Sequence, residues 1–326
     1  MILSAASSGD SVVRMLLSEP MKLALIWGLL ALGLYLSFRI LDVADLSLEG
    51  TFPVSGIITV LAINAGLNPW VSLLLAMAFG ALMGLVTAAL NVYLKIPFLL
   101  SGIIVMTALF SVNVLLGHGS VTIAESSNTV FGWLDDAFVS GLSGLGWGTP
   151  KYWGNFFGTA LVLVLIDAAV AGMVYWFFGT EIGLAIRASG RNRETASASG
   201  INNRLSVLLC MSISGAVIAL AGSLYAQDKI TATNTAGQGT LVLSLAIVFI
   251  GELVLRGVSF KTHLASIFVG GFVYWLILGL IEKIPGFNVN FIYLIQAAMM
   301  TVVMVLGLLI KKLPKKGAKK EAVTHA

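Results

Sequence analysis

Long stretches without a charged residue dominate the hydrophobic pattern of this chain. Such stretches separate Glu49 from Lys95 and Arg204 from Asp228, and others lie at 96–117, 230–251 and 284–310. A helix that spans the hydrocarbon core of a membrane needs about 20 mainly apolar residues. The pattern therefore predicts repeated membrane-spanning helices. Because the apolar runs are continuous and do not alternate with polar positions, they do not fit a transmembrane barrel.

We expect an all-α fold, a polytopic membrane helix bundle formed by a single transmembrane domain over 1–326. The expected spans cover 21–41, 51–67, 70–94, 97–117, 155–178, 205–225, 240–256, 263–282 and 290–311. This gives about nine spans, with eight to ten open, because boundaries read from sequence shift by several residues.

Composition supports the membrane assignment and narrows the chemistry. Charged residues make up 10% of the chain, against about 25% in soluble domains, and the mean hydropathy is +0.98. The single cysteine, Cys210, lies in an apolar run, which excludes a disulfide framework or a cysteine-based metal site. His118, His263 and His325 have no metal-like spacing, so we expect neither a metal site nor a catalytic site.

Lysine and arginine predict the orientation, because they concentrate in cytoplasmic connections. In the nine-span scheme only five of the 19 lie on one side: Arg14, Lys22, Lys151, Lys229 and Lys283. The other side is therefore predicted to be cytoplasmic, with the N-terminus outside and the C-terminus inside a prokaryotic plasma membrane. The basic tail at 312–326 would anchor this topology.

Two further connections have expected roles. Residues 11–19 are predicted to form a short amphipathic helix lying on a membrane face. The external loop at 118–154 is rich in glycine, serine and tryptophan. It is either a solvated loop or a small external helix at which a partner docks.

The polar segment at 180–204 interrupts the apolar pattern on the predicted cytoplasmic side. We expect helix to continue from the fifth span through Glu181 to Ser189 and to stop at Gly190. Asn192 is a good N-cap, and Glu194 lies in the first turn of a following two-turn helix that Gly200 terminates. Such a short helix is not stable alone in water. It therefore has to pack against another surface.

This segment has two interpretations. It is either an ordinary polar connector with topology-setting arginines, or a docking element that transmits force to a cytoplasmic partner. Its length favours docking, because connections in compact domains are usually about 4–6 residues long.

The stretch GLAIRASGRNRETASASGIN resembles the cytoplasmic coupling segment of ABC importer permeases of the branched-chain amino acid and ribose type. The positions that match the pattern and are expected to dock an ATPase are Gly183, Arg187, Ala188, Gly190, Asn192, Glu194, Ala196, Gly200 and Ile201. DLSLEGTF at 45–52 is similar to a second element of that family. It departs by carrying Glu49, as in a branch linked to tryptophan or tyrosine uptake, and the resemblance extends from about residue 21 to 311.

The resemblance implies a set of partners. These are a second permease copy, two ATP-binding subunits and an extracytoplasmic substrate-binding protein, all working at a membrane and without nucleic acid. The chain contains no G-x-x-x-x-G-K-[ST] phosphate loop. ATP and magnesium are therefore expected on a partner subunit, and this chain is expected to be a transport subunit without a cofactor of its own.

Two broken places between spans share a pattern. DVADLSLEG (42–50) and QDKITATNTAGQG (227–239) each precede a short span that begins with Gly-Thr. By the predicted topology these spans run in opposite directions, as in an inverted repeat built around discontinuous helices. If the repeat holds, the polar groups nearest the substrate pathway are Ser47, Glu49, Thr51, Asn234, Thr235, Gln238 and Thr240.

Two carboxylates lie within predicted spans. Asp167 lies near the middle of its span, where a charged carboxylate costs about 2.5–3.5 kcal/mol on insertion scales. It is interpreted as a structural hydrogen-bonding group, with substrate contact and proton coupling as alternatives. Glu252 is expected to pair with Arg256 one helical turn away.

The combined prediction is the permease subunit of an ATP-driven ABC importer for a small polar solute. An amino acid is the expected solute, with aromatic and branched-chain amino acids as candidates. The alternative is a stand-alone secondary transporter or channel in which Asp167 couples transport to a proton.

Overall fold

The computed structural model describes residues 20–124, 128–132, 151–255, 259–281 and 291–312. Its helices are the first helix (Pro20–Ile40), α2 (Leu48–Asn64), α3 (Pro69–Leu94), α4 (Phe98–Gly117), α6 (Lys151–Phe177), α7 (Glu181–Arg191), α8 (Arg193–Ala198), α9 (Asn203–Lys229), α10 (Thr240–Val254), α11 (Phe260–Ile281) and α12 (Ile292–Lys312). The last turn of the first helix, Leu36–Ile40, is a π-helical turn.

The expected all-α membrane bundle is confirmed. Among the described residues, six helices are long and apolar enough to cross a membrane, and three shorter apolar helices lie at Leu48–Asn64, Thr240–Val254 and Leu294–Val305. The expected interfacial helix at 11–19 lies outside the described residues, as do most of the tail at 312–326 and much of the loop at 118–154.

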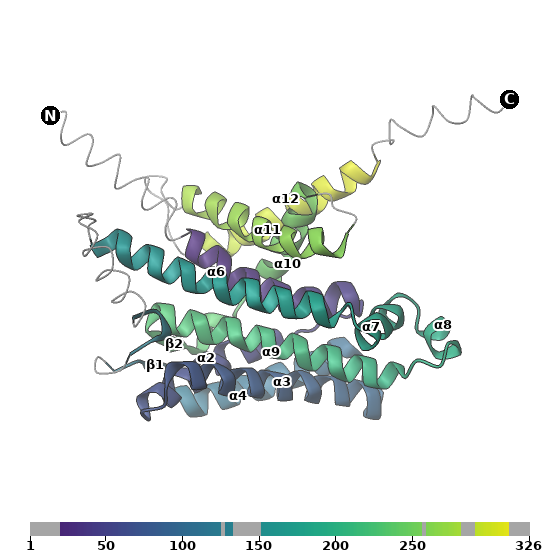
Figure 1. Cartoon of the computed structure of the whole chain (residues 1–326), viewed down its shortest axis with the longest axis horizontal. Coiled ribbons are helices and arrows are strands. Elements are labelled where there is room, and N and C mark those ends of the chain that lie inside the picture. The colour runs from purple at the N-terminus through teal and green to yellow at the C-terminus, as the bar shows by residue number, and fades with distance from the viewer. Residues whose placement is uncertain (1–19, 125–127, 133–150, 256–258, 282–290, 313–326) are drawn as a thin grey trace.

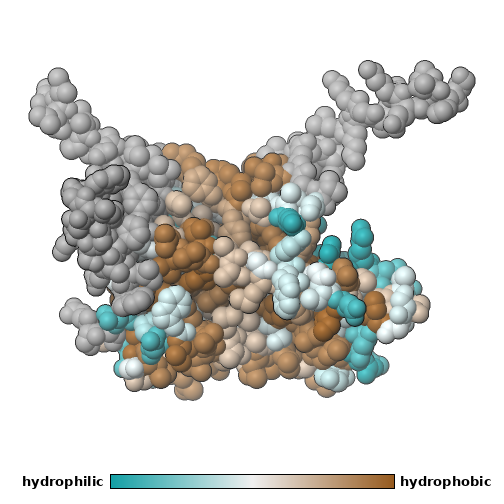
Figure 2. Space-filling model, in the orientation of Figure 1, coloured by the Kyte–Doolittle hydropathy of each residue, from teal (hydrophilic) through white to brown (hydrophobic). Residues whose placement is uncertain are grey.

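The long helices lie side by side along the longest axis of the molecule, with α7 and α8 at one end (Figure 1). At the other end Ser120–Thr122 (β1) pairs antiparallel with Thr231–Thr233 (β2), a pairing that the hydrophobic pattern did not predict. On the face shown in Figure 2, hydrophilic surface gathers toward both ends and hydrophobic surface lies between them. This distribution suits a bundle whose middle is surrounded by lipid.

The first helix and α9 form the centre of the bundle, since they are the most buried of the six long helices. The ring of Trp27 stacks on that of Phe52 from α2, with the ring of Tyr225 from α9 beside both. Small residues bring neighbouring backbones together: a Cβ atom on Gly80 of α3 would overlap the carbonyl oxygen of Gly215 in α9. Such close packing is typical of helix interfaces in membranes.

Candidate functional site

The short helix α8 is capped at both ends by local interactions. The Asn192 side-chain oxygen accepts a hydrogen bond from the backbone N–H of Thr195, at 3.0 Å. At the other end the N–H of Ile201 donates to the carbonyl of Ala196, and the N–H of Gly200 donates to that of Ser197. With Gly200 at a φ of 81°, these two bonds form a Schellman motif. The predicted N-cap and C-terminal glycine are therefore confirmed.

Asn203, in the first turn of α9, connects α8 to its surroundings. Its amide nitrogen donates to the carbonyl of Arg193 and to the hydroxyl of Ser197, both at 2.7 Å. Its amide oxygen accepts a hydrogen bond from the buried hydroxyl of Ser189 in α7, at 2.8 Å. Asn203 therefore fixes α8 relative to both α7 and α9.

The helix α7 does not begin or end as predicted. It is a separate helix from α6, because the chain breaks after Phe177 and Thr180 caps the new N-terminus by accepting a hydrogen bond from Gly183. Gly190 does not stop α7, which continues to Arg191. Gly190 instead permits close approach, since a Cβ atom there would overlap the carbonyl oxygen of Ile40.

One face of α8 is exposed. Ala196 is 3% exposed and is the buried residue of this helix, whereas Arg193, Glu194, Thr195 and Ala198 are exposed. Figure 1 shows α8 projecting beyond the ends of the long helices. Thus α8 is a short polar helix that is fixed to α7 and α9 on one side and exposed on the other, at this end of the bundle.

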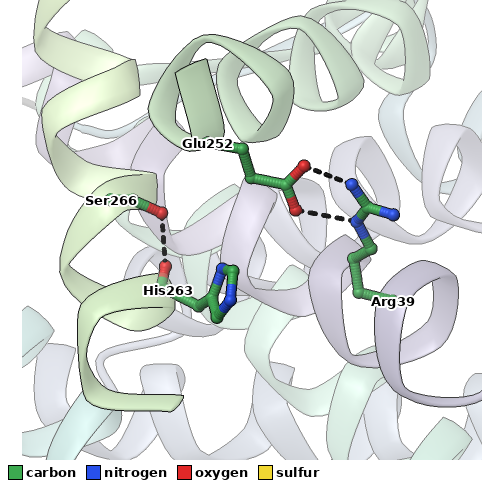
Figure 3. A network of polar contacts seen from close by, with 4 residues as sticks. All are labelled: Arg39, Glu252, His263 and Ser266. Carbon is green, nitrogen blue, oxygen red and sulfur yellow. Dashed lines mark hydrogen bonds and ion pairs between the residues drawn. The ribbon is translucent and has the colours of Figure 1, made fainter. Parts of the chain in front are cut away.

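Arginines from several elements meet at the same end. Arg39 of the first helix pairs with Glu252 of α10 through two hydrogen bonds, one of them between Nε and Oε1 at 2.7 Å (Figure 3). The guanidinium of Arg187 lies over the ring of Phe260 at 4.9 Å, and that of Arg193 lies over the ring of Phe98 at 5.8 Å. The expected partner of Glu252 was Arg256, which lies outside the described residues, so that pair stays a prediction, and the pair with Arg39 was not predicted.

The two broken segments come together in the middle of the bundle. The short helix Asn234–Gly237 (η2) packs on the start of α2 so closely that a Cβ atom on Gly237 would overlap the carbonyl oxygen of Glu49. The Glu49 carboxylate accepts a hydrogen bond from the N–H of Leu241, in the first turn of α10, at 3.4 Å. Glu49 therefore lies between the N-termini of α2 and α10.

From this meeting point α2 and α10 run to opposite ends of the bundle. The last residue of α2, Asn64, donates to the carbonyl of Thr122 in β1 at 2.9 Å, which places it at the strand end. Glu252, near the end of α10, pairs with Arg39 at the end that carries α7. At 17 and 15 residues, each helix is short for a hydrocarbon core of about 30 Å. Two oppositely directed, discontinuous helices are thus present, as expected for an inverted repeat.

A cavity of about 220 Å³ opens beside this meeting point. Of the expected pathway residues, Glu49, Asn234 and Gln238 line it, together with Asn113 of α4. The others do not. Ser47, Thr51 and Thr240 are buried, and the hydroxyls of Thr51 and Thr240 bond to nearby backbone carbonyls, whereas Thr235 is exposed.

Asp167 lies in α6 and does not line the cavity at Glu49. It is 4% exposed, and neither carboxylate oxygen has a hydrogen-bond partner among the described residues. It lines an apolar cavity of about 580 Å³ between α6, the first helix and α11. The expected structural hydrogen bond is therefore not formed within the described part of the chain.

Sequence reasoning missed Asn203 and Arg39 as organising residues. Asn202 caps α9, and Asn203 follows it directly. The sequence therefore indicates a helix cap at this point, but it does not indicate that Asn203 contacts α8. The pair between Arg39 and Glu252 joins residues 213 positions apart. A local sequence pattern cannot indicate a contact between residues so far apart in the chain.

The helices that could cross a membrane, two of them discontinuous, define the class as a polytopic membrane protein. Residues 16–304 match the family described as branched-chain amino acid transport system / permease component. The chain belongs to this family. It is therefore a permease component of a transporter and a multi-pass protein of a prokaryotic membrane.

Relatives within the family transport different solutes. The chain is 30% identical over 255 residues to the tyrosine transport system permease protein of Clostridioides difficile (strain R20291), covering 78% of this chain and 79% of that protein. It is 26% identical over 253 residues to a probable branched-chain amino acid transport permease protein, LivH, of Methanocaldococcus jannaschii, covering 75% and 73%. It is also 27% identical over 258 residues to the D-allose transport system permease protein AlsC of Escherichia coli (strain K12), covering 75% and 67%. No solved structure matches the chain significantly.

Proposed function

We propose that this chain is the permease subunit of an ATP-driven importer for an amino acid. Its proposed partners are a second copy of itself, two ATP-binding subunits that carry ATP and magnesium, and an extracytoplasmic substrate-binding protein. The observation that carries the proposal is α8: a helix capped at both ends, fixed from behind by Asn203, and exposed on its outer face.

In this proposal α8 docks into an ATP-binding subunit on the cytoplasmic side. Its exposed residues are small or charged, which allows a partner surface to approach closely and to pair with Arg193 and Glu194. Of the residues expected to dock, Asn192, Ala196, Gly200 and Ile201 shape α8 and its ends. Gly183, Arg187, Ala188 and Gly190 belong to α7, and we propose that they support α8 from the bundle.

The meeting of α2 and α10 supports an amino acid as the solute. Helix N-termini carry partial positive charge and attract a carboxylate, and discontinuous helices of transporters use this to bind anionic groups. Glu49 beside them supplies the negative charge that an ammonium group needs. We propose that the cavity at Glu49 contacts the zwitterionic part of the solute during passage.

The experiment that tests the docking proposal places a large charged side chain on the outer face of α8. Ala198→Arg changes an exposed residue and leaves the buried Ala196 and the caps intact. We expect this variant to fold normally, to lose co-purification with its ATP-binding subunit and to lose ATP-dependent uptake. The matched control is Ala65→Arg, an exposed alanine at the strand end, which should retain the ATP-binding subunit.

Unchanged association of the Ala198→Arg variant would remove α8 as the docking element. The stand-alone secondary transporter remains the alternative, because Asp167 is buried without a partner among the described residues. Membership of a permease-component family weighs against it.

A further inference from the structure

A basic cavity lies behind α7 and is distinct from the exposed face of α8. It has a volume of about 640 Å³ and is formed by the end of the first helix, by α7 and by the start of α11. Arg39, Arg187, Arg191, Tyr35 and His263 line it. Three separate elements therefore direct cationic or hydrogen-bonding side chains into one space.

The charges around this cavity are not balanced. Arg39 is neutralised by its pair with Glu252. Arg187 and Arg191 have no carboxylate within ion-pair distance among the described residues. The two arginines lie one turn apart on the same face of α7. Like charges at this spacing destabilise a helix by a few tenths of a kcal/mol. Two uncompensated guanidinium groups are thus held together where an anion would relieve their repulsion.

The cavity also offers hydrogen-bonding groups without partners. The Nδ1 atom of His263 is buried and has no hydrogen-bond partner in the described chain, and Figure 3 shows its imidazole directed toward the Arg39–Glu252 pair. The guanidinium of Arg187 lies over the ring of Phe260, which packs against it from the start of α11. The planar guanidinium of arginine is suited to two-point binding of phosphate oxygens.

We propose that this cavity binds a phosphate group, and that the source is the headgroup of an anionic phospholipid. The location favours a lipid, because the cavity lies at the arginine-rich end of the bundle, where α11 begins and its apolar surface gives way to polar residues. Basic pockets between membrane helices near the cytoplasmic face are established sites for acidic headgroups. The tyrosine and phenylalanine rings of Tyr35 and Phe260 suit the glycerol and upper acyl region below the phosphate.

The cavity shares Arg187 and Ala188 with the α7 residues proposed to support α8, but it includes no residue of α8 itself. The proposal therefore does not rest on docking at α8. A bound lipid would fix α7 to the first helix and α11, and through Ser189 and Asn203 it would stabilise the base of α8. Anionic lipid would then adjust how firmly α8 is held.

The test measures thermal unfolding of the full chain in neutral detergent, with added phosphatidylglycerol, phosphatidylcholine or inorganic phosphate. We expect phosphatidylglycerol to raise the unfolding temperature and phosphatidylcholine to leave it unchanged. In the Arg187→Gln/Arg191→Gln variant the phosphatidylglycerol concentration for half the effect should rise by roughly tenfold, since charge-assisted hydrogen bonds are lost. Arg193→Gln/Arg204→Gln is the matched control, because it removes the same charge at the same end but outside the cavity.

The outcomes separate the sources of phosphate. Stabilisation by inorganic phosphate that disappears in the cavity variant would support the site and assign it to a soluble ligand. Equal stabilisation of the cavity variant and the original chain would overturn the proposal, as would an equal loss in the control variant. If the double variant does not fold, Arg191→Gln alone provides the same comparison, because the Arg191 side chain is exposed.

Discussion

Asn203 shows how one side chain can determine the position of a functional helix. Its amide bonds to Arg193 and Ser197 of α8 on one side and to Ser189 of α7 on the other. The helix it holds is six residues long and makes few other contacts with the bundle. The rigidity that the proposed force transfer requires therefore depends on a residue outside α8.

Replacing Asn203 with alanine should loosen α8 without unfolding the bundle. Each lost hydrogen bond weakens the attachment by about 1 kcal/mol. We expect limited trypsin digestion at Arg191 and Arg193 to become several-fold faster. Thr195→Ala is the control, because the Thr195 side chain is exposed and makes no hydrogen bond among the described residues. Equal digestion of Asn203→Ala and the original chain would show that α8 is held by other contacts.

Gly190 gives a second prediction at the residue scale, because the atom nearest to it in space belongs to the backbone and cannot move aside as a flexible side chain can. A Cβ atom there would overlap the carbonyl oxygen of Ile40, so Gly190→Ala should destabilise the chain by about 1–3 kcal/mol, as overpacking does. Gly172→Ala is the matched control in a helix, because a Cβ atom at Gly172 meets nothing within 4 Å. Thermal unfolding in detergent should separate the two variants clearly. Similar unfolding temperatures would mean that α7 does not press against the first helix.

Local signals and contacts between distant residues differ in how well the sequence predicts them. Asn192 and Gly200 could be assigned as caps because capping depends on neighbours within a few positions. Gly190 was misread as a stop, since the sequence shows a helix-breaking residue type and not the carbonyl that approaches it. The Arg39–Glu252 pair depends on the arrangement of the whole bundle.

At the scale of elements, the meeting of α2 and α10 is the feature most relevant to transport. Both helices begin close to the Glu49 side chain and run to opposite ends of the bundle. Their two N-termini bring partial positive charges together, and the Glu49 carboxylate compensates them. An arrangement of this kind can bind a solute that carries both signs of charge.

We expect Glu49→Gln to reduce amino acid uptake by at least roughly tenfold, because a charge-assisted contact to the solute ammonium is lost. The amide oxygen of glutamine can still accept the hydrogen bond from Leu241, so the fold should be maintained. Association with the ATP-binding subunit should also be unchanged, which separates this effect from docking. Full uptake by the Glu49→Gln variant would exclude Glu49 from solute contact.

Most elements could be predicted because their apolar runs are long and uninterrupted. The helices described here begin and end within a few residues of the nine expected spans. The β1–β2 pairing was missed because each strand is only three residues long and its partner lies more than 100 positions away. The break between α6 and α7 was missed because Phe178 and Gly179 do not interrupt the local hydrophobic pattern as strongly as a proline would.

At the scale of the whole molecule, the described residues place α8 and the Arg39–Glu252 pair at one end and the β1–β2 pair at the other. The discontinuous helices lie between them. This arrangement connects the proposed docking element at one end to the proposed solute cavity in the middle through α10 and the first helix. It fits a transporter in which movement at the docking end changes access to the cavity.

Asp167 provides a prediction at the same scale, because the two transport classes assign it different roles. In an importer driven by ATP, Asp167→Asn should retain ATP-dependent uptake by the reconstituted complex, and a pH gradient alone should drive none. Uptake in proteoliposomes with and without the ATP-binding subunit distinguishes the two. Transport by this chain alone under a pH gradient, lost in Asp167→Asn, would establish the secondary transporter.

The most direct test of the account is the side of the membrane on which α8 lies. Replacing Cys210, the single cysteine, with alanine and Thr195 with cysteine leaves one thiol on the exposed face of α8. The account predicts that a membrane-impermeant maleimide labels this thiol in inside-out vesicles and not in intact cells, and that the bound ATP-binding subunit blocks the labelling. Labelling from outside intact cells would contradict the account, because a cytoplasmic ATP-binding subunit could not reach α8.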